Sequence, residues 1–106
     1  MEMNDLHVSH WEAANSPTEN LLKEIMRQNN LDPVVMTNNP YDTYFAHKHT
    51  FHKVVYIVRG TVTFNLPILK KKFVLIAGDR FDLPAGIVHS VEIGAEGAVF
   101  LEGLVK

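Results

Sequence analysis

The chain has 106 residues, of which 46% are hydrophobic and 21% charged, and its formal net charge is −2. This length fits one domain with a single hydrophobic core, and the slight negative charge argues against nucleic acid as a partner. Because the sequence contains no cysteine, disulfides and thiolate metal ligands are excluded. Any metal ion would have to be held by histidine nitrogens and oxygen donors.

No stretch of the sequence has the pattern of a membrane span or a secretion signal. The longest apolar run, residues 73–77, is far shorter than the about 20 residues that a spanning helix needs. Residues 1–5 lack the basic segment followed by an apolar one with which a signal peptide begins. We therefore expect no membrane partner and a cytoplasmic location.

One helix is predicted within residues 1–33, a segment that we expect to pack on the rest of the domain as an arm and helix. Residues 16–19, Ser-Pro-Thr-Glu, have the form of a capping box with proline at the first helical position. Four apolar residues then recur at helical spacing: Leu21, Leu22, Ile25 and Met26. The helix is predicted over about residues 17–29, and its apolar stripe must pack on the outside of a barrel or on a partner subunit.

From residue 34 onward the sequence consists of short runs rich in valine, threonine and aromatic residues, separated by turn residues. Eight strands are predicted, at residues 34–37, 43–49, 53–58, 61–66, 71–76, 80–83, 88–92 and 98–105. Many short strands at near-regular spacing favour an all-β sandwich or barrel. We expect residues 34–106 to form one compact jelly-roll barrel, with the lysines at 70–72 on an exposed hairpin or strand edge.

The predicted strand at residues 53–58 is apolar on both faces. Valine, tyrosine and valine at the even positions alternate with lysine, valine and isoleucine at the odd ones. Both faces of such a strand should be covered by other parts of the protein. Trp11 and the helix stripe, or a second subunit, would cover one face, and on this ground we expect a homodimer.

Two histidines, His47 and His49, lie two residues apart in a predicted strand. Side chains at i and i+2 of a strand leave the same face, with Cα atoms roughly 6.5–7 Å apart. Two imidazoles so placed converge on one ion at the usual Zn–N distance of about 2.0–2.1 Å. Two histidines on an exposed strand face are also common without a metal, so the pair alone leaves both interpretations open.

A second segment supplies a third histidine. It reads Gly78, five residues, Pro84-Ala85-Gly86, two residues and His89. Gly78 permits a tight turn, Pro84 ends a strand with a fixed φ, and Gly86 lets the chain reverse. His89 then opens the next strand, where it can face back across the barrel toward the histidine pair.

These two segments resemble the two sequence motifs of the cupin superfamily. Residues 47–49, His-Lys-His, together with Gly60 are similar to the first motif, and residues 78–89 are similar to the second. The resemblance covers roughly residues 34–104. It implies a double-stranded β-helix, the cupin or jelly-roll barrel, with a divalent metal ion between the two motifs.

The resemblance implies that the ion is held by His47, His49 and His89, and by a glutamate four residues after the second histidine. Lys53 stands at that fourth position, with six residues between it and Gly60. The register of the motif is therefore intact while its carboxylate is missing. An ammonium has no free lone pair and does not ligate a metal. Two main interpretations of the site follow, and a third is a degenerate barrel in which the histidines only satisfy local hydrogen bonds.

In the first interpretation, the three neutral histidines hold an iron, manganese, nickel or zinc ion and leave positions open for water or substrate. Losing the carboxylate makes the site more positive by one unit, and a protonated Lys53 adds another. The preferred ligand is then a small anionic molecule. The protein would be a small metal-dependent oxygenase or isomerase, in which the ion acts as Lewis acid and template.

In the second interpretation, Lys53 replaces the metal. The pocket then binds a small anion through lysine and histidine donors, as a non-catalytic binding or sensor module. A further histidine, His52, stands between His49 and Lys53. Strict alternation along a strand turns it away from the trio, toward the surface or an interface, whereas a bend between the strands would turn it inward as a substitute ligand or base.

Overall fold

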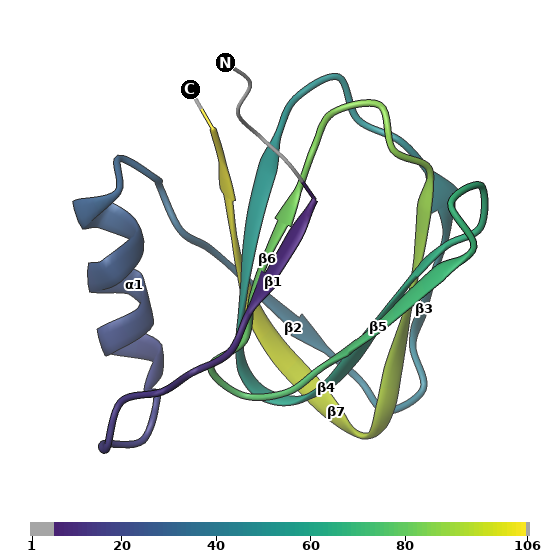
Figure 1. The fold of residues 1–106 in the computed structure, drawn as a ribbon. Coiled ribbons are helices and arrows are strands. Elements are labelled where there is room, and N and C mark those ends of the chain that lie inside the picture. The colour runs from purple at the N-terminus through teal and green to yellow at the C-terminus, as the bar shows by residue number, and fades with distance from the viewer. Residues whose placement is uncertain (1–5, 106) are drawn as a thin grey trace.

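The part of the chain that the structure describes, residues 6–105 of a computed structural model, forms one helix and seven strands (Figure 1). The helix α1 spans Glu19–Gln28. The strands, in chain order, are β1 His7–Ser9, β2 Val34–Asn38, β3 Thr43–His47, β4 Lys53–Leu66, β5 Lys71–Leu75, β6 Arg80–Leu83 and β7 His89–Leu104. The prediction of an all-β fold with one N-terminal helix is confirmed.

Two long antiparallel strands, β4 and β7, organise the sheet. They pair from Lys53 opposite Leu104 to Asn65 opposite Ser90. At one end of this pair, β6 and then β1 extend the sheet beyond β4, and β2 extends it beyond β7. At the other end, β5 pairs with β4 and β3 pairs with β7. The long strands therefore run through both layers, which curve around a common interior (Figure 1).

Two predicted interruptions are bends within these long strands and not strand ends. The strands expected at 53–58 and 61–66 are the single strand β4, and those expected at 88–92 and 98–105 are the single strand β7. The register of the pair shifts near Gly60, where φ is +83° and an added Cβ would lie 2.1 Å from the Gly97 carbonyl oxygen. Only glycine tolerates this φ and this approach, so the turn residue marks a bend.

The helix covers the outer face of the sheet beside the first half of β4 (Figure 1). Leu22 and Met26 are fully buried there. They form a cluster with the outward side chains Val54, Tyr56 and Leu101, and Trp11 packs against the same cluster. The expectation that the helix stripe and Trp11 cover one face of this strand is confirmed.

The helix begins two residues later than the capping-box pattern predicted. Its N-cap is Thr18, whose hydroxyl accepts a hydrogen bond from the Leu21 N–H at 3.2 Å. Ser16 and Pro17 precede the cap. Both Ser16 and Thr18 carry the side-chain oxygen that an N-cap needs, so the sequence pattern alone does not distinguish between them.

The interior between the two layers is filled almost entirely by apolar side chains. The buried core consists of Val55, Ile57, Val62, Phe64, Leu66, Leu75, Phe81, Leu83, Val91, Ile93, Ala98 and Phe100. Among the described residues, four buried positions are polar or charged: Asn38, Lys53, Asp79 and His89. Two of these, Lys53 and His89, begin the two long strands and mark the polar end of the interior.

The N-terminal arm adds a short strand that the sequence pattern did not predict. β1 pairs with β6, with His7 opposite Asp82. Beyond it, the exposed ring of His10 lies 2.8 Å through Nδ1 from the buried carboxylate of Asp79. Three residues are too few to show a period-two pattern, so this strand is decided by its pairing with β6.

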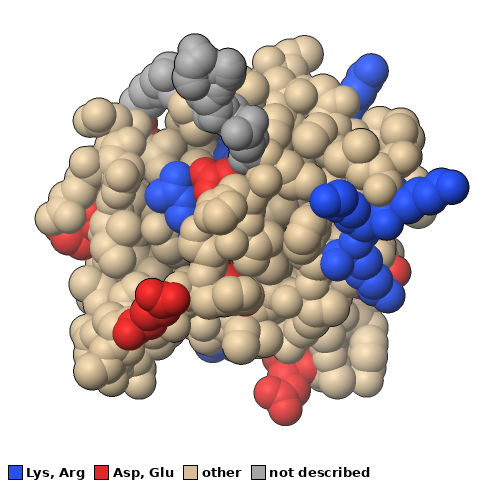
Figure 2. Space-filling view, viewed as in Figure 1, with Lys and Arg blue, Asp and Glu red and all other residues tan. Residues whose placement is uncertain are grey.

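Charge is distributed unevenly on the face seen in Figure 2, where lysine and arginine side chains gather on the side away from α1. The hairpin of β4 and β5 lies on this side and carries the exposed lysines Lys70, in the turn, and Lys71 and Lys72, at the start of β5. The prediction that this basic run sits on an exposed hairpin is confirmed. The helix of residues 19–28 is also too short to cross a membrane.

Candidate metal centre

The structure brings His47, His49 and His89 together at one end of the interior. His47 lies directly opposite His89 in the ladder between β3 and β7. The ring centroids are 4.4 Å apart for His47 and His89, 4.7 Å for His47 and His49, and 5.3 Å for His49 and His89. One possible ligand atom from each ring lies within 4.8 Å of the other two.

His49 reaches this cluster by a route that the strand pattern did not predict. β3 ends at His47, so His49 belongs to the following loop and not to a shared strand face. The His49 carbonyl accepts a hydrogen bond from the Gly86 N–H at 2.8 Å. This bond joins the loop after the first motif to the turn of the second, which holds the His49 ring over the end of the barrel.

His52 serves the same junction and is not part of the histidine cluster. Its Nδ1 accepts a hydrogen bond from the Ala85 N–H at 2.9 Å, and its carbonyl accepts one from the Val105 N–H at 3.0 Å. The side chain is half-buried. His52 therefore acts as a brace between the two motif loops, a role for which the sequence carries no signal because Ala85 is distant along the chain.

Hydrogen bonds to the backbone decide which nitrogen of His47 and His89 carries the proton. His47 Nδ1 lies 2.6 Å from the Phe45 carbonyl oxygen, and His89 Nδ1 lies 3.0 Å from the Ile87 carbonyl oxygen. A carbonyl oxygen only accepts, so each Nδ1 must be the donor. Each neutral ring then presents the lone pair of Nε2, and this is the arrangement in which metal-ligating histidines are usually held.

The surroundings also favour the neutral form of two of the rings. Burial lowers the pKa of His89 to about 4, and the nearby His47 and Lys53 act in the same direction. Burial lowers the pKa of His49 as well, followed by the positive charge of Lys53. Both rings are therefore uncharged at pH 7, which is the state that can donate a lone pair to a metal ion.

Lys53 lies inside the barrel, where only 7% of its surface is exposed. Its Nζ is 3.3 Å from His49 Nε2 and 3.2 Å from Glu102 Oε2. Glu102 lies on β7 directly opposite Val55, on the interior face of the sheet. The carboxylate missing from the first motif is thus supplied to the same pocket from the last strand.

Sequence reasoning missed Glu102. In the strand predicted at 98–105, this residue shares a face with Phe100, which is buried in the core. That alternation was the available signal. A lone glutamate near the end of a strand is usually solvent-exposed, and nothing in the sequence states that Lys53 lies within reach of it.

The histidines, Lys53 and Glu102 line an interior pocket of about 180 Å³. The remaining wall is mostly apolar and consists of Met36, Tyr44, Phe64, Val91 and Phe100. The Tyr44 hydroxyl donates a hydrogen bond to Asn38 Oδ1. Burial raises the pKa of Tyr44, and the charge of Glu102 raises it further, so the phenol stays protonated at neutral pH. A pocket of this size admits only a compact molecule.

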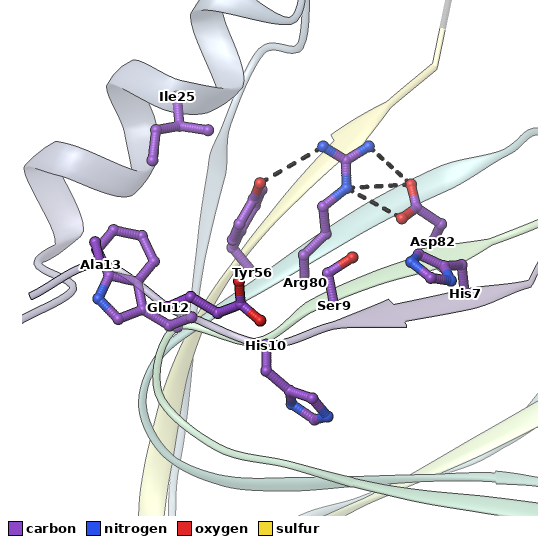
Figure 3. A pocket seen from close by; sticks show the side chains of 11 residues that line it. His7, Ser9, His10, Glu12, Ala13, Ile25, Tyr56, Arg80 and Asp82 are labelled. Carbon is purple, nitrogen blue, oxygen red and sulfur yellow. Dashed lines mark hydrogen bonds and ion pairs between the residues drawn. The ribbon is translucent and has the colours of Figure 1, made fainter.

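A larger cavity, of about 630 Å³, lies on the outer face between α1 and β1 (Figure 3). On its floor Arg80 donates to Asp82 through Nε and Nη2, at 2.8–3.3 Å, and through Nη1 to the Tyr56 hydroxyl at 3.5 Å. The hydrogen bonds that Arg80 donates to Asp82 raise the pKa of Arg80. Arg80 and Asp82 are therefore paired with each other on this outer face, and the cluster of possible metal ligands lies in the interior pocket.

The residues present fit a divalent first-row metal ion. Three imidazoles converge, two of them with Nε2 freed by a backbone hydrogen bond, and imidazole nitrogens suit iron, nickel, copper and zinc. Three protein ligands also leave positions open for water or substrate. The trio could therefore hold a metal ion, and the ammonium beside His49 is the feature of this site that sets it apart from a plain three-histidine centre.

No protein-family profile and no curated protein matches the chain. Solved structures do match it. An RmlC-like cupin from Shewanella frigidimarina superposes with a TM-score of 0.61 and 24% identity over 70% of this chain and 64% of its own. The chain has the cupin fold. The matched part of this chain spans slightly less than two thirds of the length of that Shewanella cupin.

Two further structures agree on the fold. A DUF861 family protein from Thermotoga maritima covers 95% of this chain and 100% of its own length, with a TM-score of 0.62 and 19% identity. An oxalate decarboxylase from Bacillus subtilis covers 70% of this chain and 20% of its own, with a TM-score of 0.60 and 26% identity. The resemblance to cupins inferred from the two motifs is confirmed at the level of the fold.

Proposed function

We propose that this cupin binds one iron, manganese, nickel or zinc ion through His47, His49 and His89 and acts with it on a small anionic molecule, as an oxygenase or isomerase. The observation that carries the proposal is the convergence of three imidazoles, of which His47 and His89 are oriented by hydrogen bonds to their own backbone. Metal-ligating histidines are usually oriented in this way, by donation of the other ring N–H to a carbonyl or carboxylate.

Charge and size support a compact anion as the ligand. Lys53 and Glu102 form an ion pair at 3.2 Å and cancel each other, which corrects the expectation that Lys53 adds a unit of positive charge to the pocket. Histidine ligands carry no negative charge, so the positive charge of a bound ion would not be neutralised by the residues that hold it. The pocket volume of about 180 Å³ restricts the ligand to a few heavy atoms, and oxalate, named in one of the similar structures, is a molecule of this class.

The residues of the chain have separable roles in this proposal. A bound ion would supply Lewis acidity and a template for the substrate. Phe64, Phe100 and Met36 exclude water from the pocket and thereby strengthen polar contacts inside it. The Lys53 ammonium is a donor for a substrate carboxylate, and the protonated Tyr44 hydroxyl lies on the same wall.

The second candidate function is a metal-free module that binds a small anion through Lys53 and the histidines. The contact between Lys53 Nζ and His49 Nε2 favours it, because the ammonium lies against one of the three ligand rings. In this case the pocket would bind carboxylates equally well before and after treatment with a chelator.

Metal titration of the untagged protein tests the proposal. After chelator treatment, isothermal titration with Mn²⁺, Ni²⁺ and Zn²⁺, and with Fe²⁺ without oxygen, should show one ion per chain. His47→Gln should weaken binding at least about tenfold, the range expected for loss of metal-site interactions, whereas His7→Gln, at an exposed histidine outside the site, should leave it unchanged. Absence of binding by every ion would contradict the proposal.

Preference for an anion is tested with matched small molecules. Acetate should bind to the metal-loaded protein with a measurably lower dissociation constant than acetamide, since the two differ in charge and hardly in shape. Equal binding of both would contradict the anionic substrate while leaving the metal site untouched.

A further inference from the structure

The contact between Lys53 and His49 places a cation inside the histidine cluster before any metal arrives. Lys53 is held from two sides, by His49 Nε2 at 3.3 Å and by Glu102 Oε2 at 3.2 Å. Its side chain is 8% exposed and that of Glu102 is 25% exposed. The ammonium is therefore a fixed part of the pocket and not a surface charge that happens to lie nearby.

The chemistry of this contact sets His49 apart from the other two histidines. An ammonium only donates, so His49 Nε2 must accept with its lone pair. In a neutral imidazole the second nitrogen then carries the proton, and the ring has one lone pair in its plane. A lone pair that accepts from Lys53 is not available to a metal ion, whereas in the described residues no hydrogen bond occupies Nε2 of His47 or His89.

Glu102 is a second hydrogen-bond acceptor for the Lys53 ammonium. Lys53 has three donor hydrogens, and the carboxylate can keep the ammonium when His49 is withdrawn from it. A hydrogen bond between two charged groups is stronger than one to a neutral ring. The ammonium can thus leave His49 without being left unpaired in the interior, which would be costly for a buried charge.

We propose that Lys53 is a tethered cation that competes with the metal ion for His49, and that Glu102 is the partner that keeps the ammonium when the ion binds. The inference rests on the proposed metal site and adds its regulation. Lys53 is a positioning residue, which acts through His49 and not on the reacting atoms. The competition lowers metal affinity below that of the three histidines alone, since the ion must replace a hydrogen bond to a charged donor and also approaches a positive charge.

Substitution of the lysine gives the direct test, with Zn²⁺ as the probe. Lys53→Met removes the ammonium and keeps an unbranched side chain of similar length. It should bind Zn²⁺ at least about tenfold more tightly than the unmodified protein, the effect expected from one charged hydrogen bond. Lys48→Met is the matched control, because Lys48 is exposed and stands between the two motif histidines. This control removes the same charge and should change affinity less than threefold or so.

A second pair of variants separates the ammonium from the carboxylate, because Lys53→Met also leaves Glu102 without its partner. Glu102→Gln alone should weaken Zn²⁺ binding, since Lys53 then has no other strong acceptor and stays on His49. Adding Lys53→Met to Glu102→Gln should restore tight binding. Thermal unfolding of each metal-free variant checks the fold, and Lys53→Gln, which is also neutral, replaces Lys53→Met if the latter does not fold.

The outcomes distinguish this inference from the proposed function. If the unmodified protein binds Zn²⁺ and neither neutral variant of Lys53 binds it more tightly, the competition is disproved and the metal site stands. If only the lysine variants bind, the inference holds, while the proposed function fails because the ammonium keeps the ion out. If no variant binds, both are wrong.

Discussion

His89 is the most enclosed of the three histidines, with 1% of its surface exposed. Its Nδ1 is fixed by the Ile87 carbonyl, and its ring faces those of His47 and His49. This burial lowers the pKa of His89 to about 4, below the ordinary value of about 6.5. The same residue is therefore both a candidate ligand and the group whose titration should be visible in the stability of the metal-free protein.

We predict that the metal-free protein loses stability as the pH falls from about 6.5 to about 4. In this window His89 binds a proton in the unfolded chain but stays unprotonated in the folded one, because its pKa is lower there. Acid therefore favours unfolding. Urea unfolding at pH 7 and pH 5 in the presence of a chelator measures the effect. The variant His89→Gln should show a smaller loss over the same interval, because carboxylates titrate in both proteins. Equal losses would show that burial of this ring does not control its protonation.

At the scale of single residues, the sequence identified the three histidines but not their supports. Spacing within two motifs indicated His47, His49 and His89, and all three meet in the structure. Glu102 and the bracing contact of His52 were not predicted. Their partners, Lys53 and Ala85, are 49 and 33 residues away along the chain, and side-chain contacts of that range depend on the strand register.

The elements that carry the site are two bent strands, and the bend depends on glycine. At Gly60 and Gly97 φ is +83° and +74°, and the strands approach so closely that an added Cβ at Gly60 would lie 2.1 Å from the Gly97 carbonyl oxygen. β4 and β7 cross from one layer to the other at this point. Lys53 and Glu102 lie toward one end of this strand pair and His89 at the other, and the bend brings both ends to the same pocket.

We predict that Gly60→Ala lowers the free energy of unfolding by about 2–5 kcal/mol, the sum of about 1–2 kcal/mol for backbone strain and about 1–3 kcal/mol for overpacking. Gly86→Ala is the matched control. Gly86 has the same φ of +83°, but nothing lies within 4 Å of its added Cβ, so only the strain of about 1–2 kcal/mol should remain. Urea unfolding curves give both values. Equal losses would mean that the close approach of the two strands contributes nothing.

The prediction of helices and strands succeeded where it depended on a local sequence pattern. It failed where pairing with another strand determined how far a strand continues. The apolar stripe of α1 was read correctly because i, i+3 and i+4 positions lie on one helix face. Breaks were expected at residues 59–60 and 94–97 because glycine usually ends a strand. In the structure the partner strand continues the hydrogen-bond ladder past both places, which no local pattern records.

At the scale of the whole molecule, the surfaces left uncovered decide whether further subunits are needed. α1 and Trp11 cover the outer face beside β4, so the face that led us to expect a homodimer does not itself require one. Exposed apolar side chains remain on the edge strands at the other end of the sheet. They include Phe45 on β3, 91% exposed, and Val74 on β5, 58% exposed. The homodimer stays a prediction, and the exposed apolar side chains of β3 and β5 are the surface through which we expect it to form.

Sedimentation equilibrium should show a dimer that Phe45→Asp weakens at least about tenfold, since a buried charge without a partner is strongly unfavourable at an interface. Leu104→Asp is a matched control, because Leu104 is 48% exposed on β7 at the opposite end of the sheet. Its dissociation constant should stay close to that of the unmodified protein. A monomer at every concentration would contradict the homodimer.

The sequence by itself determined the class of fold, the helix stripe and which three histidines lie together in the structure. Each of these depends on residue types at short, fixed spacings, which a helix turn, a strand pleat or a glycine turn converts directly into geometry. The tertiary structure decided which groups meet the histidines. Pairing of β4 with β7 sets Glu102 opposite Val55 and thus beside Lys53. The lysine that replaces the expected glutamate is therefore held by Glu102 against His49.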